Sequence, residues 1–568
     1  MTMMSGAEIL IECWKKEGVK VIFGYPGATT IDIHHHLAVS GLRFVLCRHE
    51  QAAVHAADGY ARSTGRPGVV LVTSGPGATN TITGLAGAHM DSVPVLVFSG
   101  QVSRLLIGND AFQEVDIVGV SRPVTKHNYL VLSTEDLAQT VKEAFYVATS
   151  GRPGAVLVDL PKDVMSGQAE FHYPRKVELR AYQPHLAPHP KQVQKVADLL
   201  SKAKRPIIYG GGGIISSGAS EELLRLAETL EIPVTTTLMG LGGFPGSHPL
   251  ALGMLGMHGL YRANMAVQSA DLILAVGARF DDRVTGALSH FAPEAVMIHI
   301  DVDTTSIHKV VDVDVPLVAD ARQALVAVLE SLGPAPSFDR EGRAQWREQI
   351  RAWDTDCPLA YDRGPMEGIK PQAVIEALYR QTGGKAIIVT EVGQHQMWAA
   401  QYYLCDSPRQ FITSGGLGVM GFGLPAALGV LIDKPDATVV DIAGDGSILM
   451  NVQELATAVQ ENLPVKVAIL NNGCLGMVRQ WQELFYQGRY AATILGGGPD
   501  FVKLAESFGA KGFRATRLQE VEGVIAQGLA EPGPVLMDFA VLPTELVYPM
   551  VPGGKALDEM ILDKANLP

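Results

Sequence analysis

Cysteine is scarce in this sequence of 568 residues, and its spacing is not that of a disulfide-rich or metal-binding protein. There are five cysteines, an odd number, and no two of them form a C-x-x-C pair. We therefore expect neither a disulfide framework nor a metal held by thiolates. Reduced thiols in a cytoplasmic protein are the simplest interpretation.

The chain also lacks the signals of export, membrane insertion and nucleic-acid binding. Residues 1–15 contain neither the basic nor the long apolar segment of a secretory signal. No uncharged apolar run reaches the ~18 residues that a membrane span requires. Lysine and arginine number 46 against 59 aspartate and glutamate residues, so the net charge is −13. A general surface for nucleic acid is not expected, because phosphate binding needs clustered cations.

Short apolar runs are abundant, and hydrophobic residues make up 47% of the chain. The runs predict buried strands at 68–73, 94–99, 206–209, 272–276, 386–390, 438–442 and 465–470. Continuous Val, Ile and Leu runs separated by helix-length segments predict parallel sheets that helices cover on both faces. The expected fold class is therefore α/β.

Two proline-rich segments, 166–190 and 333–371, divide the chain, and we predict that both are linkers. We expect three open parallel-sheet domains and a short tail, at 1–165, 190–333, 372–540 and 541–568. The first and third blocks share a weak pattern of strand, Gly-x-Gly turn, helix and strand, at 70–101 and 439–473. Any βαβ unit would give such a pattern, so it predicts little by itself.

The third block carries a motif that joins two predicted strands. Gly444-Asp445-Gly446-Ser447 follows one strand, and Asn471-Asn472 ends the next. The carboxyl ends of neighbouring parallel strands lie side by side, so Asp445 and Asn472 are expected to converge. A carboxylate and an amide oxygen suit Mg²⁺, and the glycines let the backbone approach a diphosphate. The pattern is the thiamin diphosphate signature; the alternative is a structural turn before an asparagine-rich strand end.

Further long motifs are spread over all three blocks. They include CRHEQAAVHAADGYAR at 47–62, TSGPGATN at 73–80, VGARFDDRVTG at 276–286, VGQHQMWAAQ at 392–401 and SGGLGVMGFGLPAALG at 414–429. With these motifs the sequence resembles the catalytic subunit of the acetohydroxyacid synthase (acetolactate synthase) family over nearly its whole length. The resemblance implies an enzyme that decarboxylates pyruvate on thiamin diphosphate and transfers the hydroxyethyl group to a second pyruvate or to 2-oxobutyrate. This reaction is the first common step of valine, leucine and isoleucine biosynthesis.

The resemblance also implies catalytic residues. Glu50 matches the glutamate that activates the cofactor through its pyrimidine ring, and Arg283 matches an arginine that binds the acceptor's carboxylate. Trp481 matches a residue that selects the larger acceptor. Gln113 and Lys162 match residues at the entrance of the active site. From the residues alone, Glu50 would belong to a surface helix turn and Arg283 to a salt bridge with its acidic neighbours.

Three cofactors are implied: thiamin diphosphate, Mg²⁺ and FAD. The positions that match thiamin diphosphate contacts are Glu50, Gly393, Gln394, His395, Gly418, Met420, Gly446, Ser447, Leu475, Gly476 and Met477. The positions that match metal ligands are Asp445, Asn472 and, through its main-chain carbonyl, Cys474. The positions that match FAD contacts are Arg152, Gly211, Gly212, Gly213, Thr237, Leu238, His258, Gly277, Arg279, Asp301 and Asp320. A Gly run after a strand also predicts close backbone approach to a phosphate.

In the family the cofactor lies between two subunits, so the resemblance implies a homodimer or tetramer, often joined by a separate regulatory small subunit. The sequence departs from the family at Ala28-Thr29, where Gly-Ala is usual, and at Glu391, which replaces an aspartate. We expect Thr29 and the methyl group of Ala28 to narrow the entrance and weaken inhibitors that bind there. Two alternatives stay open. One is a sister enzyme such as a pyruvate oxidase or decarboxylase, and the other is a non-catalytic paralogue that binds the cofactor.

Overall fold

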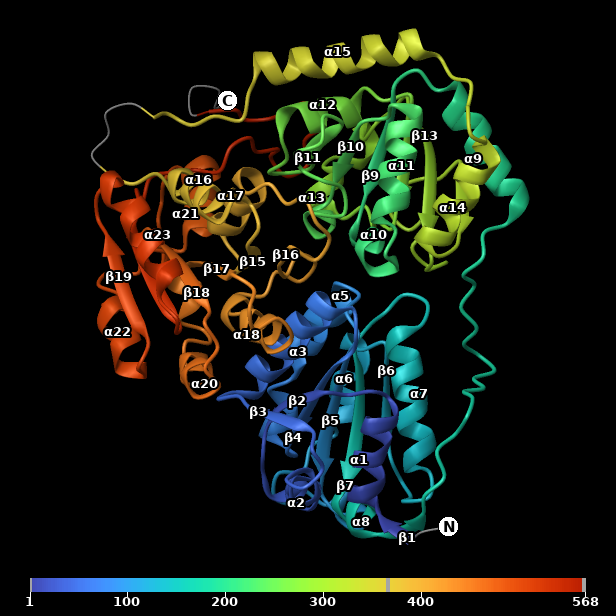
Figure 1. Cartoon of the computed structure of the whole chain (residues 1–568), viewed down its shortest axis with the longest axis vertical. Coiled ribbons are helices and arrows are strands. Elements are labelled where there is room, and N and C mark those ends of the chain that lie inside the picture. The colour runs from blue at the N-terminus through green and yellow to red at the C-terminus, as the bar shows by residue number, and fades with distance from the viewer. Residues whose placement is uncertain (1–2, 364–367, 564–568) are drawn as a thin grey trace.

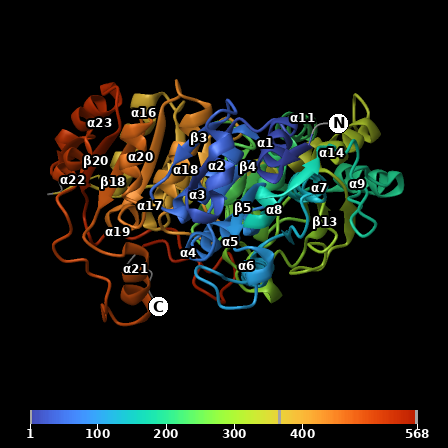
Figure 2. The same cartoon turned by 90° about the horizontal axis from the view of Figure 1, so that it is seen from below.

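The computed structural model describes residues 3–363 and 368–563. Three six-stranded parallel sheets, each between layers of helices, confirm the predicted α/β class (Figure 1). We call the parts around them the N-terminal region (3–170), the middle region (190–332) and the C-terminal region (371–540). In Figure 1 the N-terminal region lies below the other two. Seen from below in Figure 2, it covers the junction between them.

The N-terminal sheet has the strand order β3 (Arg43–Leu46), β2 (Val21–Tyr25), β4 (Gly68–Val72), β5 (Val95–Gln101), β7 (Val156–Pro161) and β6 (His127–Leu130). Val69 and Leu71 pack in one apolar cluster with α1 (Gly6–Lys16) and α7 (Leu137–Thr149). Val70 and Val72 pack in the opposite cluster with α3 (Glu50–Thr64) and α5 (Ile82–Met90). Since both faces of β4 are buried, this strand is apolar at every position.

The C-terminal sheet repeats this arrangement. Its strand order is β16 (Phe411–Ile412), β15 (Ile387–Thr390), β17 (Val439–Gly444), β18 (Lys466–Asn471), β20 (Val535–Ala540) and β19 (Lys511–Ala515). Helices α16 (Pro371–Thr382), α17 (Gln394–Tyr402) and α23 (Val521–Ala530) cover one face. Helices α18 (Gly423–Asp433), α20 (Glu454–Gln460) and α22 (Phe501–Phe508) cover the other. The weak internal repeat of the sequence thus corresponds to a repeated topology.

The middle sheet is wound differently. Its strand order is β11 (Ala251–Met254), β10 (Val234–Thr236), β9 (Pro206–Gly210), β12 (Leu272–Val276), β13 (Val296–Asp301) and β14 (Val315–Val318). In this order the chain reverses direction across the sheet between β9 and β12. The same order is found in sheets that bind dinucleotides, and the ligand lies beyond the carboxyl ends of the strands at that reversal.

One predicted linker is wrong in part, because segment 333–371 contains helix α15 (Arg340–Asp356). The helix covers one face of the middle sheet, where Trp346 and Ile350 are buried. Trp353, one turn after Ile350, packs against Trp346 with ring centroids 5.6 Å apart. The prolines of the segment flank the helix and leave this apolar spacing intact. The proline density of the whole segment therefore predicted a linker where a helix forms.

Helices α3 and α18 join the N-terminal and C-terminal regions. A methyl group added at Gly59 of α3 would collide with the carbonyl of Ala426, and one at Gly429 of α18 with the carbonyl of Ala56. The two backbones therefore touch where the helices cross. Because α3 begins at Glu50 and α18 follows the segment 414–422, this crossing fixes two predicted site segments relative to each other.

The C-terminal tail, described to residue 563, passes over the C-terminal and middle regions (Figure 1). The N–H of Val547 donates to Gln480 Oε1 at 2.8 Å, and the N–H of Val551 donates to the carbonyl of Met257 at 2.8 Å. At the other end of the chain, β1 (Met3–Ser5) pairs antiparallel with β8 (Gln168–Glu170). Among the described residues, no helix is both long and apolar enough to span a membrane.

Candidate active site

A cavity of about 990 Å³ lies where the three regions meet. It opens beyond the carboxyl ends of β9 and β12, at the reversal point of the middle sheet. All of the positions predicted to contact FAD line it: Arg152, Gly211, Gly212, Gly213, Thr237, Leu238, His258, Gly277, Arg279, Asp301 and Asp320. The structure thus brings together residues that lie far apart in the sequence.

The glycine run after β9 also has a packing role within the protein. A methyl group at Gly211 would collide with the carbonyl of Gly277, and one at Gly213 would lie 2.5 Å from the Cα of Gly277. The glycines therefore let the turn after β9 pack directly on the turn after β12. This close backbone contact within the protein requires glycine, in addition to any room that a phosphate would need.

Several buried polar atoms of this cavity have no hydrogen-bond partner among the described residues. They include Thr237 Oγ1, His258 Nδ1 and Tyr209 Oη. Burial lowers the pKa of His258 to about 4, so its ring is neutral at neutral pH. Buried polar groups are normally paired, so orphaned ones along a cavity wall fit a polar ligand.

A second, smaller cavity of about 80 Å³ lies at the carboxyl edge of the C-terminal sheet. Gly444 on β17 is paired with Leu470 on β18, so the residues that follow these strands converge as predicted. The predicted diphosphate and metal positions line this cavity: Gly393, Gln394, His395, Asp445, Gly446, Ser447, Asn472, Cys474, Leu475, Gly476 and Met477.

Asp445 and Asn472 present oxygen atoms at this cavity. Burial raises the pKa of Asp445 to about 6, and neighbouring backbone N–H groups offset part of that shift. A bound cation would stabilise the charged carboxylate further. Asn472 Oδ1 accepts the N–H of Cys474 at 3.1 Å, while burial raises the pKa of the Cys474 thiol. The donor set therefore fits a hard cation held by oxygen, because the thiol stays protonated.

His395 and Gly476 complete the fit to a diphosphate. His395 Nε2 is buried without a partner, and burial lowers the pKa of its ring to about 3. A methyl group at Gly476 would lie 2.6 Å from Asn472 Nδ2, so only glycine leaves the carboxamide in place. In the described part of the chain, no group of three or more His, Cys, Asp or Glu side chains is arranged to hold a metal ion. Mg²⁺ needs only one or two protein carboxylates beside a diphosphate.

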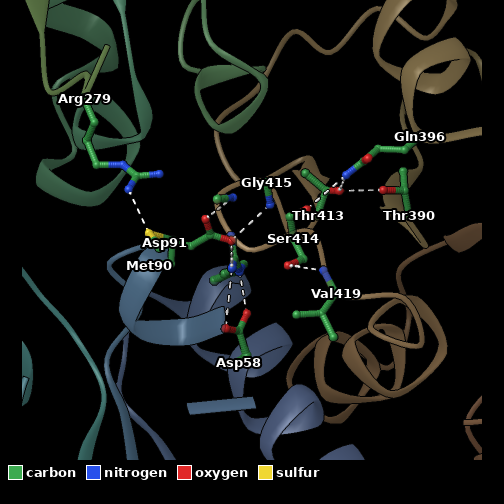
Figure 3. Close-up of polar contacts among 12 residues, drawn as sticks. Asp58, Met90, Asp91, Arg279, Thr390, Gln396, Thr413, Ser414, Gly415 and Val419 are labelled. Atoms are coloured by element: carbon green, nitrogen blue, oxygen red, sulfur yellow. Dashed lines mark hydrogen bonds and ion pairs between the residues drawn. The ribbon is translucent and has the colours of Figure 1, made fainter. Parts of the chain in front are cut away.

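The two cavities meet at Gly393, Met420 and Met477, which line both. Met420 and Gly418 belong to a loop, residues 414–420, between β16 and α18. Gly418 has a φ of +69°, a conformation that favours glycine. Within the loop, the N–H of Val419 donates to Ser414 Oγ at 3.1 Å (Figure 3).

Glu391 lies beneath the end of this loop. Its carboxylate accepts the N–H of Gly421 at 2.6 Å. Burial raises the pKa of Glu391 to about 8, and it raises the pKa of the neighbouring Asp441 as well. Two buried carboxyl groups close together favour protonation of at least one of them. The replacement of aspartate by Glu391 therefore keeps an acid in contact with the loop.

Arg283 and Trp481 both line the large cavity, next to the loop. Arg283 follows β12 in α13 (Asp282–Thr285), is 62% exposed and lies 3.2 Å from Asp282. Trp481 lies on α21 (Gly476–Phe485) and packs edge-on against Phe485. The acidic neighbour predicted for Arg283 is present, but the pair is exposed and weak, so the guanidinium is available to another carboxylate.

The other predicted catalytic residues lie apart, at the carboxyl edge of the N-terminal sheet. Glu50 opens α3 and accepts a hydrogen bond from Asn80 Nδ2 at 2.9 Å. Gln113 has a φ of +59° and packs against Gly75. Lys162 is exposed at the start of α8 (Lys162–Ser166). None of the three lines either cavity, so one chain holds the predicted catalytic set as two separate groups.

Thr29 also lies at this N-terminal edge, where its hydroxyl is turned toward its own sheet. Thr29 Oγ1 accepts the N–H of Ser74 at 3.1 Å and lies 3.0 Å from Thr73 Oγ1. Ala28 is exposed. The hydroxyl thus anchors the turn after β2 to the turn after β4. The expected narrowing by Thr29 therefore has to come from its methyl group and from Ala28.

Known proteins match the chain along its whole length. Family models of the thiamine pyrophosphate enzymes match it three times, with the N-terminal TPP binding domain at residues 4–120, the central domain at 193–328 and the C-terminal TPP binding domain at 391–539. The acetolactate synthase isozyme 3 large subunit of Escherichia coli is 51% identical, over 100% of both chains. The acetolactate synthase large subunit of Haemophilus influenzae is 48% identical over 99% of both. The probable one of Methanocaldococcus jannaschii is 48% identical over 98% of this chain and 95% of its own.

The chain belongs to the acetolactate synthase large subunit family of thiamine pyrophosphate enzymes. This confirms the predicted enzyme class, a thiamin diphosphate-dependent acetolactate synthase. Thiamin diphosphate is therefore the cofactor of this enzyme family.

Sequence reasoning assigned no role to several polar residues of the candidate site. Asn80 lies within a quoted motif, but only the fold shows that it holds Glu50. Gln480 joins Gln394 to the C-terminal tail through Val547. Asp91 follows α5, within the repeated pattern at 70–101 but outside the family motifs, and lines the large cavity. No periodicity or spacing marks such residues, because their partners lie far away in the sequence.

Proposed function

We propose that this chain forms 2-acetolactate from two pyruvates and 2-aceto-2-hydroxybutyrate from pyruvate and 2-oxobutyrate, as the catalytic subunit for branched-chain amino-acid biosynthesis. One observation carries the proposal. The small cavity with Asp445 and Asn472 adjoins, at Met420 and Met477, the large cavity with Arg283 and Trp481. Ligands for a metal diphosphate therefore stand next to groups that suit a 2-oxoacid acceptor.

Asp445, Asn472 and the main-chain carbonyl of Cys474 would hold Mg²⁺ and so offset the negative charge of the diphosphate. Gly393, His395 and the helix that opens at Gly476 would hold the diphosphate itself. Gly418 and Met420 would support the pyrimidine ring. When bound, thiamin diphosphate supplies the electron sink for decarboxylation and the nucleophilic carbon for ligation.

Glu50 would hydrogen-bond a ring nitrogen of the pyrimidine and exchange a proton with it. Asn80, at 2.9 Å, fixes the carboxylate for that task. Because Glu50 lines neither cavity of its own chain, we propose that it completes the site of a second copy, in a homodimer or larger homo-oligomer. Gln113 and Lys162 would then approach the same site from the second copy.

The substrate groups are assigned by chemistry. Arg283 presents a planar guanidinium that suits the carboxylate of the acceptor. Binding would replace the exposed ion pair between Arg283 and Asp282 by a pair with the acceptor. Trp481 would contact the alkyl group of the acceptor. One extra methylene is worth about 1–3 kcal/mol, so the preference between pyruvate and 2-oxobutyrate is expected to be modest.

FAD is proposed for the large cavity, on the strand order of the middle sheet and the orphaned Thr237, Tyr209 and His258 atoms. The ligation transfers no net electrons, so the flavin would be structural. A pyruvate oxidase would instead reduce the flavin, and that outcome distinguishes the sister enzyme.

The domain limits that we propose are the predicted ones, 1–165, 190–333, 372–540 and 541–568.

Two further proposals concern the cellular setting. The relatives are named large subunits, so a separate small regulatory subunit is proposed as a partner. All five cysteines are free, which supports a reducing, cytoplasmic compartment.

The testing experiment is acetolactate formation from pyruvate by the purified chain with thiamin diphosphate, Mg²⁺ and FAD. We expect Glu50→Gln to lower the rate by about 100-fold or more, because the amide cannot exchange a proton with the pyrimidine ring. Glu341→Gln, at an exposed glutamate of α15, is the matched control and should retain full activity. Acetaldehyde or reduced flavin in place of acetolactate would assign the chain to a sister activity, and cofactor binding without turnover would indicate a missing subunit or a non-catalytic paralogue.

A further inference from the structure

Side chains from all three regions converge on the loop 414–420, which carries Gly418 and Met420 (Figure 3). A methyl group at Gly416 would lie 2.5 Å from Met90 Cγ and 2.8 Å from Arg279 Nη2. The first belongs to the N-terminal region and the second to the middle region. The loop is therefore packed from outside its own region, and its position depends on how the regions dock.

Asp91 makes the polar contacts between the N-terminal region and this loop. Asp91 Oδ2 accepts the N–H of Gly415 at 3.1 Å, and Asp91 Oδ1 accepts the N–H of Gly416 at 2.7 Å (Figure 3). The aspartate side chain is 0% exposed. Replacing the carboxylate would remove the charged acceptor that the N–H groups of Gly415 and Gly416 share.

The carboxylate of Asp91 is itself held in place by α3. Arg62 Nη2 donates to Asp91 Oδ2 at 2.9 Å, and Arg62 Nε donates to Asp58 Oδ1 at 2.5 Å. The guanidinium also lies 5.4 Å from the ring centre of Phe422, just before α18. Burial alone would lower the pKa of Arg62, but Asp58 and Asp91 raise it overall, so the arginine stays charged. The network thus orients Asp91 and joins α3 to both ends of the segment 415–422.

The rest of the loop is held from within its own region. Gln396 Nε2 donates to Thr413 Oγ1 at 2.7 Å and to the carbonyl of Ser414 at 3.1 Å (Figure 3). These contacts fix the base of the loop at the end of β16. They do not reach Gly415 and Gly416, whose N–H groups both point to Asp91.

We propose that Asp91 is a positioning residue for the thiamin diphosphate site: it holds the loop 414–420 in the conformation that presents Gly418 and Met420 to the cofactor. The inference rests on the proposed function, which assigns those two residues to the pyrimidine ring. Asp91 lines the large cavity but not the small one, so it acts on thiamin diphosphate through the loop. A side chain of the N-terminal region thereby sets the cofactor affinity of the C-terminal region.

The test compares Asp91→Asn with a matched control, Asp271→Asn. Asp271 also accepts two consecutive backbone N–H groups, those of Lys204 and Arg205 at 2.8 and 2.9 Å. It directly precedes β12, at the opposite end of this strand from the large cavity. The readout is the dissociation constant of thiamin diphosphate with Mg²⁺, from the quenching of tryptophan fluorescence, well below the unfolding temperature. We expect Asp91→Asn to weaken binding by about tenfold and Asp271→Asn by less than about twofold.

Either of two results would overturn the proposal. One is an Asp91→Asn protein that binds thiamin diphosphate within about twofold of the parent chain. The other is an Asp271→Asn protein that loses as much affinity, since the effect would then follow from general destabilisation. The proposed function is judged separately: a parent chain that binds the cofactor but forms acetaldehyde or reduces flavin in place of acetolactate refutes that function, while the Asp91 comparison still decides this proposal.

A second pair of variants tests the loop from its own side, should Asp91→Asn fail to fold. Gly416→Ala would place a methyl group 2.7 Å from Asp91 Oδ1, whereas Gly415→Ala would meet the flexible thioether of Met239. We expect Gly416→Ala to weaken thiamin diphosphate binding by about tenfold and Gly415→Ala by clearly less. Equal losses in the two variants would count against Asp91, because the loop would then be sensitive to any added bulk.

Discussion

The N-terminal and C-terminal sheets have the same strand order, and a buried aspartate occupies the same place in each. Asp159 on β7 receives a hydrogen bond from Gln101 Nε2 at 2.9 Å. Asp538 on β20 receives one from Asn471 Nδ2 at 3.0 Å. When the sheets are aligned on these aspartates, the register of the ladders places Val72 with Ala443, and therefore Ser74 with Asp445. A hydroxyl in one sheet thus stands where a carboxylate stands in the other.

The difference shows how one topology serves two tasks. The C-terminal edge places a carboxylate, an amide oxygen and a helix N-terminus around a small cavity, which suits a metal diphosphate. The N-terminal edge has Ser74, Gly75 and Pro76 at the same place, and it presents Glu50 from α3. Strand order fixes where a site can form, and the residues just after the strands decide its chemistry.

The largest expected effect comes from removing the carboxylate that distinguishes the two edges. We expect Asp445→Asn to weaken Mg²⁺ and thiamin diphosphate binding by about 100-fold or more, because a direct ligand is lost. Titration calorimetry would measure it. Ser74→Ala, at the equivalent N-terminal position, should leave the Mg²⁺ dependence unchanged, and a loss there would break the comparison.

Asp445→Asn also tests whether one active site combines the C-terminal sheet edge of one chain with the N-terminal sheet edge of another chain. Asp445→Asn and Glu50→Gln are each expected to be inactive, yet a mixed dimer of the two would contain one intact site. Random pairing after co-expression should therefore restore about a quarter of the parent activity. Absence of any recovery would mean that Glu50 and Asp445 act within a single chain.

A smaller effect is expected from the two buried aspartates. Asp538 is paired with Arg514 at 2.8 Å, whereas Asp159 has only the neutral partners Ser99 and Gln101. Burial raises the pKa of Asp159 from 3.8 to about 7, so the folded chain keeps a proton that the unfolded chain has lost. Its stabilising contribution is complete below about pH 4 and is lost as the pH rises through about 7.

Asp159→Asn imitates the protonated acid, so its free energy of unfolding should change less than that of the parent chain between about pH 5 and pH 8. Asp538→Asn should instead lose about 1–2 kcal/mol at both pH values, because Arg514 loses a buried partner. Denaturant unfolding at the two pH values would measure both variants. A parent chain whose stability does not fall over this range would show that Asp159 is ionised throughout.

The smallest effect concerns the segments that follow β5 and β18. The first carries Gln113, and the second carries Met477 and Trp481 on α21. We expect Trp481→Leu to change the preference for 2-oxobutyrate over pyruvate by about fivefold with little change in cofactor binding, because an apolar contact is only reduced. Competition between the two acceptors, read as a product ratio, would measure it. An equal change from Gln113→Asn would place acceptor selection in both segments.

The sequence predicted the layers of the fold and much of the site for identifiable reasons. Apolar runs without alternation require burial on both faces, as Val69 to Val72 show, and a Gly-Asp-Gly turn after one strand must meet the end of the next. Helix α15 was missed because its flanking prolines outweighed the spacing of Trp346 and Ile350. The role of Asp91 could not be predicted, because it depends on two N–H groups more than 300 residues away in sequence.

By itself, the sequence determined the α/β class, the convergence of Asp445 and Asn472, and the family. The first two follow from local patterns: hydrophobic runs, turn glycines and the adjacency of strands that one helix connects. The family follows from the resemblance of long motifs, such as the one at 47–62. Only the tertiary structure decided that Glu50 lies away from the cavities of its own chain and that Asp91 holds the loop 414–420. Both depend on how three separately wound sheets dock, which is set by side-chain packing such as that of Gly59 and Gly429 between α3 and α18 and has no local pattern in the chain.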